Sequence, residues 1–129
     1  MKKKSADVIF LDDNEDLREL MPILLSDALG VECRCFESLA DLQNHIDEAI
    51  RAQVAILDIN LGEDSLDGVD ALNWLRSQGF GGKIVFFTGH ARNNPHVAEA
   101  ERSGVQILEK PIDAEKLISF VKHAINGNR

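Results

Sequence analysis

The strongest fold signal in this chain is the stretch VAILDINL, residues 54 to 61. Four apolar residues lead into Asp58, and Ile59 and Leu61 continue the apolar run. Runs of this kind are typical of a strand that is covered on both faces of a parallel sheet. A buried carboxylate without a partner is costly, so the position of Asp58 needs a reason. We expect Asp58 to lie at the mouth of a central buried strand, where its negative charge serves a site.

Short apolar runs alternate with longer amphipathic segments along the rest of the chain. The pattern predicts strands at residues 6–11, 31–36, 53–59, 83–88 and 105–110. It predicts helices at about 14–29, 39–49, 69–78, 95–103 and 114–125. Five strands that alternate with five helices indicate an α/β fold with a parallel sheet, because right-handed crossovers place helices on both faces.

Single residues mark the ends of these helices. Asp13 or Asn14 is expected to cap the first helix, which Gly30 ends, and Ser38 is expected to cap the second. Pro22 fits badly because a proline inside a helix removes a backbone donor. We therefore predict either a kink at Pro22 or a helix that starts later.

Length and composition limit the class of protein. The 129 residues fit one domain, expected to span 1–129, and 44% hydrophobic residues indicate a globular chain. The net charge of −8 argues against direct binding to nucleic acid and favours cations and basic surfaces as partners. We find no export signal and no apolar run long enough for a membrane span, and we expect Cys33 and Cys35 to be free thiols.

Polar residues collect where the predicted strands end. Asp12 and Asp13, Asp58, Thr88 and Lys110 follow or close the first, third, fourth and fifth strands. In open α/β sheets, ligands bind beyond the carboxyl ends of the strands, so these side chains are expected to share one rim. Three acids without a histidine or cysteine favour magnesium as the cation that relieves their repulsion.

Four segments carry a resemblance that covers essentially the whole chain. LDDNEDLREL, VAILDINL, FFTGHA and LEKPID, in this order and spacing, resemble the signature segments of response regulator receiver domains. The resemblance implies a flavodoxin-like fold with strand order 2-1-3-4-5. It also implies a cytoplasmic signalling protein rather than an enzyme with an external substrate. The implied partners are a sensor histidine kinase or phosphotransfer protein and an output domain or effector.

The resemblance also implies a role for each site residue. Asp58 is the expected phosphoacceptor, and Asp12, Asp13 and Asp58 are expected to hold Mg²⁺ together with the backbone carbonyl of Asn60. A hydroxyl, that of Thr88, is expected to bind a phosphoryl oxygen.

Lys110 is expected to pair with the phosphoryl group, next to a Lys110-Pro111 bond that is commonly cis in the family. His90, two residues past the threonine, stands where the family tunes the lifetime of the aspartyl phosphate. An ordinary surface histidine fits the sequence equally well.

One departure from the family keeps an alternative open. Receiver domains usually carry Tyr or Phe three residues before the lysine, and this chain has Ile107. We therefore predict a smaller or differently located response around residues 92 to 126, and a docking domain that is not phosphorylated stays possible. Two other classes fit less well. A haloacid dehalogenase-type phosphatase would need an acid where Asn60 stands, and a flavin binder would not place acids in its first loop.

Overall fold

The computed structural model describes residues 6–59, 68–88, 98, 101–109 and 114–127. The strands are β1 (Val8–Leu11), β2 (Cys33–Phe36), β3 (Val54–Asp58), β4 (Lys83–Thr88) and β5 (Gln106–Glu109). The helices are α1 (Glu15–Leu29), α2 (Leu39–Asn44), α3 (Ile46–Ala49), α4 (Gly68–Ser77) and α6 (Ala114–Gly127).

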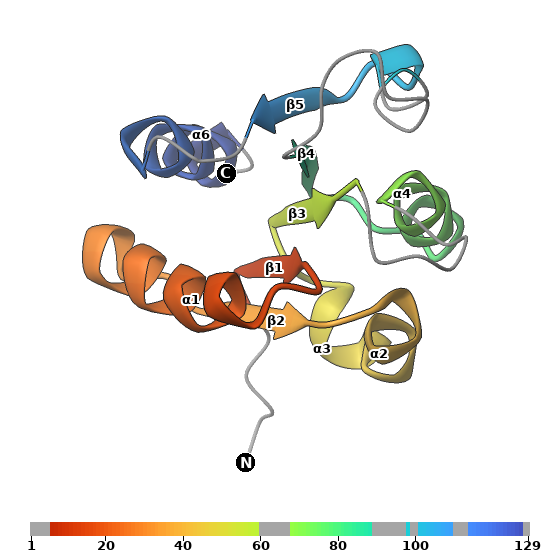
Figure 1. Cartoon of the computed structure of the whole chain (residues 1–129), viewed down its shortest axis with the longest axis horizontal. Coiled ribbons are helices and arrows are strands. Elements are labelled where there is room, and N and C mark those ends of the chain that lie inside the picture. Colours follow the sequence, from red (N-terminus) through yellow and green to blue (C-terminus); the bar gives the residue numbers. More distant parts are fainter. Residues whose placement is uncertain (1–5, 60–67, 89–97, 99–100, 110–113, 128–129) are drawn as a thin grey trace.

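The strands form one sheet in the order β2-β1-β3-β4-β5, and every neighbouring pair is parallel. Helices α1 and α6 cover one face, and α2, α3 and α4 cover the other (Figure 1). This arrangement confirms the predicted flavodoxin-like α/β fold and its strand order.

Two hydrophobic clusters fill the space between the sheet and its helices. One lies on the side of α2 and α4 and includes Leu57 and Phe86, and the other lies under α1 and α6 and includes Ile56 and Phe87. Neighbouring residues of β3 and β4 thus point to opposite faces, and all five residues of β3 are buried. The carboxylate of Asp58 is therefore held at the end of the best covered strand in the sheet.

The predicted ends of α1 are confirmed. The Asn14 side chain accepts a hydrogen bond from the Leu17 N–H at 3.0 Å, and Gly30 ends the helix with φ of 66°. The helix begins at Glu15 and runs through Pro22, so the prediction of a later start is wrong.

The sequence pattern also failed at the second helix, which was predicted as one element over 39–49. The structure divides it into α2 and α3 at His45. The ring Nδ1 of His45 lies 2.8 Å from the Asp41 carbonyl oxygen, while the His45 N–H donates to the Leu42 carbonyl instead. Because the side chain occupies the acceptor that the next helical turn needs, the helix is interrupted there.

The predicted helix at 95–103 falls mostly outside the described residues, although Glu101 and Arg102 are helical. Both cysteines are free thiols, as predicted. None of the helices in the described part of the chain is long and apolar enough to cross a bilayer.

Candidate functional site

Two buried carboxylates meet at one rim of the sheet. Asp12 directly follows β1, and Asp58 is the last residue of β3. The two strands pair in parallel with Leu11 opposite Leu57, so the next residues along each strand are neighbours at the carboxyl ends. Asp12 is 0% exposed and Asp58 is 3% exposed.

Asp13 completes a group of three acids. One carboxylate oxygen from each of Asp12, Asp13 and Asp58 lies within 4.8 Å of the others, and Asp13 is the exposed member. Mg²⁺ binds oxygen at about 2.0–2.1 Å, so opposite ligands in its shell are separated by about 4 Å. The spacing and the all-oxygen donor set therefore fit a hard divalent cation.

Repulsion within this group is substantial. The buried pair Asp12 and Asp58, with oxygens no more than 4.8 Å apart, repel by about 3 kcal/mol at an effective dielectric constant of about 20. A nearby positive charge would offset this repulsion.

Local hydrogen bonds hold Asp12 in place. The Asn14 N–H donates to Asp12 Oδ1 at 2.9 Å, and Arg18 Nη1 donates to the Asp12 carbonyl oxygen at 3.0 Å. The Asp12 N–H in turn donates to the carbonyl of Phe36 at the end of β2. The first turn of α1 and the neighbouring strand together orient this carboxylate.

Thr88 closes β4 on the same edge of the sheet and is 1% exposed. Its neighbour Phe87 pairs with Asp58, and the Ile59 N–H donates to the Phe87 carbonyl at 3.1 Å. Thr88 is therefore the residue that follows Phe87, the strand partner of Asp58.

Several of the predicted site positions lie outside the described residues. These are Asn60, His90 and Lys110. Their expected roles stay predictions. Glu109, the last residue of β5, pairs with Thr88 at this edge of the sheet.

Sequence reasoning missed the part played by Arg18. Its guanidinium group holds the Asp12 carbonyl and lies 3.9 Å from a carboxylate oxygen of Glu37. The signal was available in principle, because Arg18 lies one turn into the helix that follows the acid pair. A positive residue at that point can reach back to the strand end.

Ile107, the departure noted in the sequence, is partly buried and packs against the cluster that includes Leu57 and Phe86. It pairs with Phe86, two residues before Thr88. An aliphatic side chain fills this position, so no aromatic ring is present to exchange between buried and exposed states.

Comparisons with known proteins agree with this arrangement. The model of the response regulator receiver domain matches residues 8–122. The nitrogen assimilation regulatory protein NtrX of Azorhizobium caulinodans is 27% identical over 125 residues, which are 95% of this chain and 27% of that protein. The tetrathionate response regulatory protein TtrR of Salmonella typhimurium is 27% identical over 93% of this chain and 56% of its own length. The chain thus spans between about a quarter and about half of these relatives.

Solved structures show the same fold. A response regulator receiver protein from Pseudoalteromonas atlantica superposes with a TM-score of 0.81 at 24% identity, covering 95% of this chain and 98% of that one. The receiver domain of NtrX from Brucella abortus gives a TM-score of 0.78 at 29% identity, covering 93% and 98%. With the family model matching most of its length, the chain belongs to the response regulator receiver domain family.

Proposed function

We propose that residues 1–129 form one receiver domain that takes a phosphoryl group onto Asp58 from the phosphohistidine of a sensor histidine kinase or phosphotransfer protein. The observation that carries the proposal is the group of three carboxylates within 4.8 Å of one another. It lies at the carboxyl end of the central strand, in a chain that belongs to a signalling family.

Asp12, Asp13 and Asp58 would hold Mg²⁺, with the backbone carbonyl of Asn60 as a further ligand. When bound there, the ion would neutralise charge on the carboxylates and on the incoming phosphoryl oxygens. The described part of the ligand set consists of carboxylate oxygens only, which suits magnesium better than zinc.

The side chains then have distinct tasks. An Asp58 oxygen attacks phosphorus in line, and the bond from phosphorus to the donor nitrogen breaks, leaving the donor histidine with the electron pair. The Thr88 hydroxyl donates a hydrogen bond to a phosphoryl oxygen, and the Lys110 ammonium group pairs with the added negative charge. Burial of Asp58 and Thr88 keeps bulk water away and holds the reacting groups in position.

Incubation with acetyl phosphate and magnesium chloride tests the proposal without the partner. Intact mass should show the gain of one phosphoryl group, which hydroxylamine removes and EDTA prevents. Asp58→Asn should abolish the gain. The matched control is Asp27→Asn, an exposed acid on α1, which should react like the unchanged chain. Equal labelling of Asp58→Asn would show that the acceptor is elsewhere.

A docking domain that is not phosphorylated is the second candidate, and Ile107 is the residue that favours it. The same experiment separates the two, because that candidate predicts no gain of mass with acetyl phosphate. The folded state of the protein in this assay is checked by circular dichroism.

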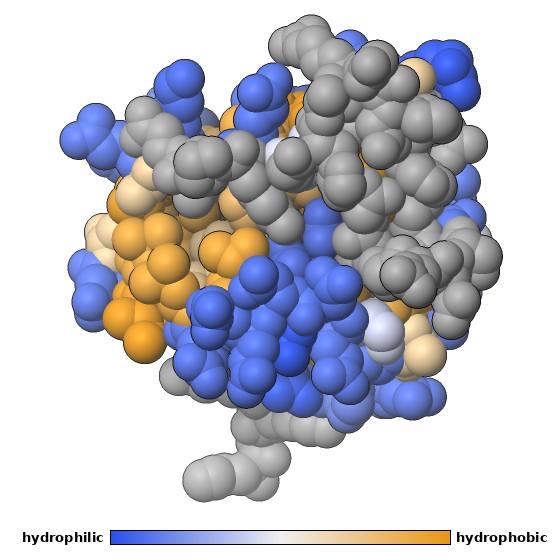
Figure 2. Space-filling view, in the orientation of Figure 1, coloured by the Kyte–Doolittle hydropathy of each residue, from blue (hydrophilic) through white to orange (hydrophobic). Residues whose placement is uncertain are grey.

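The partner would approach over α1. Leu20 and Ile23 on this helix are large hydrophobic residues with 53% and 60% exposure. Figure 2 shows an apolar area on this side of the molecule, over α1 and towards α6. Because α1 begins directly after the acid pair, a protein that covers this area is also close to Asp58. Output would pass to a further domain or effector, and free thiols at Cys33 and Cys35 suit a cytoplasmic protein.

A further inference from the structure

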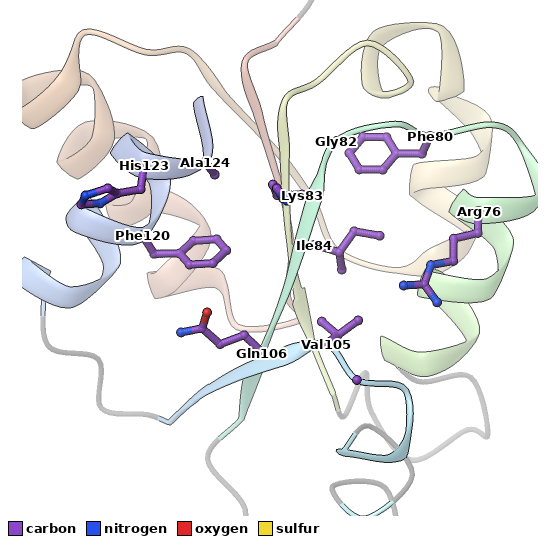
Figure 3. Close-up of a pocket in the computed structure, with 11 residues that line it drawn as sticks. Arg76, Phe80, Gly82, Lys83, Ile84, Val105, Gln106, Phe120, His123 and Ala124 are labelled. Carbon is purple, nitrogen blue, oxygen red and sulfur yellow. The ribbon is translucent and has the colours of Figure 1, made fainter. Parts of the chain in front are cut away.

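A groove opens at the end of the sheet opposite to the three acids. Its volume is about 620 Å³, and it lies beside the first residues of β4 and β5. Figure 3 shows Arg76 and Phe80 on one side of the sheet and Phe120 and Ala124 on the other, with the strands between them. The volume lies within the range of ligand-binding sites in proteins.

One wall of the groove is a sheet edge that β5 leaves uncovered. The first residue of β5, Gln106, pairs with Val85, so the two earlier residues of β4 have no strand partner on this side. The Lys83 N–H donates to the Gln53 carbonyl at 2.9 Å, on the β3 side. Backbone groups of successive strand residues point to opposite sides, so those of Ile84 point towards β5.

The N–H of Ile84 is a backbone donor at this edge of the sheet. Within the described part of the chain, no hydrogen bond joins it to the segment that precedes β5. Exposed edge groups of this kind accept an added strand from another chain. Only a short segment fits here, since β5 occupies the edge from Gln106 onward.

The charge of the groove is opposite to that of the chain as a whole. The net charge is −8, yet the lining holds Arg76, Lys83 and His123 and no Asp or Glu. In Figure 3 the guanidinium group of Arg76 points towards Ile84, whereas the ring of His123 turns outward. Among the residues that the structure describes, neither Arg76 nor Lys83 takes part in an ion pair.

Apolar side chains complete the surface on both sides of the edge. Phe80 and Ile84 line it towards α4, and Phe120 lines it towards α6. A ligand that suits the groove therefore combines negative charges, apolar side chains and an extended backbone.

We propose that this groove binds an extended acidic peptide segment of a partner protein. The segment pairs through its backbone with Ile84, places carboxylates near Arg76 and Lys83, and lays apolar side chains against Phe80 and Phe120. A small anion would use the two cations but leave the strand edge and the apolar walls unused. The proposal is independent of phosphoryl transfer, because the groove shares no residue with the site around Asp58.

The probe is a capped peptide of alternating glutamate and valine residues, with the matching lysine and valine peptide as a control. Titration into ¹⁵N-labelled protein should shift the amide signals of Ile84 and Gln106 with the acidic peptide only. Arg76→Glu combined with Lys83→Glu should weaken binding at least tenfold. Lys116→Glu, an exposed cation on α6 outside the groove, should leave binding unchanged.

A second variant tests the strand edge separately from the charge. Ile84→Pro removes an N–H that has no described partner, at the point where β4 extends beyond the first paired residue of β5; a proline is least disruptive in a sheet where its position makes no ladder hydrogen bond. It should abolish peptide binding, with folding checked by the dispersion of the amide spectrum. If that variant does not fold, the double charge variant decides alone. The proposal is overturned if the acidic peptide causes no shifts at up to about 1 mM, if the two peptides bind equally, or if citrate produces the same shifts and displaces the peptide.

Discussion

The backbone carbonyl of Arg18 lies one turn before Pro22 in α1 and accepts a hydrogen bond from Cys35. The side chain of the same residue contacts Asp12 in the acidic site. In a regular helix the N–H of residue 22 would donate to this carbonyl, but Pro22 has no N–H. The thiol of Cys35, on β2, donates to the Arg18 carbonyl at 3.4 Å instead. The helix thus continues through Pro22 with its freed acceptor satisfied from the neighbouring strand.

A double-mutant cycle with Pro22→Ala and Cys35→Ala measures how far the Cys35 thiol replaces the backbone N–H that Pro22 lacks as the donor to the Arg18 carbonyl. Pro22→Ala restores the backbone donor and should stabilise the fold by about 2 kcal/mol, which is the helix propensity difference of about 3 kcal/mol less the loss of rigidity in the unfolded chain. Cys35→Ala alone should cost about 2 kcal/mol, since it leaves a half-buried carbonyl without a donor and removes packed volume.

The two effects should not be additive. With alanine at position 22 the Arg18 carbonyl has its backbone donor, so Cys35→Ala should cost about 1 kcal/mol less than in the unchanged chain. Urea unfolding followed by circular dichroism gives the free energies of unfolding. Cys33→Ala is the matched control, because Cys33 packs against the same cluster and makes no hydrogen bond to Arg18. A coupling near zero, or equal couplings for the two cysteines, would contradict the assigned role of Cys35.

Three further outcomes follow from single residues. A hydrogen bond from the Cys33 thiol lowers the pKa of Cys35, and the nearby Arg18 and Arg34 guanidinium groups lower it further. The same hydrogen bond, together with burial, raises the pKa of Cys33. Because the thiolate is the reactive form, iodoacetamide should label Cys35 first and from a lower pH, as peptide mass mapping would show; preferential labelling of Cys33 would reverse this assignment. Arg18→Ala removes the hydrogen bond to the Asp12 carbonyl and should weaken magnesium binding several-fold in a calorimetric titration while the fold persists. An unchanged affinity would mean that this hydrogen bond is not needed to orient Asp12. Gly82→Ala should destabilise the chain by about 2 kcal/mol in urea unfolding, since a Cβ there would lie 2.7 Å from two backbone carbonyl oxygens; a neutral result would show that these neighbours move freely.

Much of the fold was predictable because its signals are local. The buried runs around Ile56 and Phe86, the cap at Asn14 and the stop at Gly30 each depend on neighbouring residues only. The grouping of Asp12 with Asp58 was also within reach. Parallel strands bring their carboxyl ends to one edge, so residues at the ends of separate strands become neighbours without any further information.

The errors arose where a side chain competes with the backbone. At His45 the ring takes the carbonyl that a continuous helix would use, and periodicity does not register such a contact. At Pro22 the pattern allowed a helix that starts later, because it does not include the thiol that arrives from β2. Arg18 was missed for a different reason, because the direction in which α1 leaves β1 decides whether its guanidinium group reaches the Asp12 carbonyl.

Apolar periodicity and the placement of acids at strand ends were therefore enough to specify a parallel α/β sheet with a carboxylate rim. They depend on spacing along one chain, which the residues themselves encode. The packing of α1 against β2 and the unpaired edge at Ile84 depend instead on contacts and register between elements distant in sequence. Such contacts exist only after the elements have packed, so they become visible in the folded structure alone.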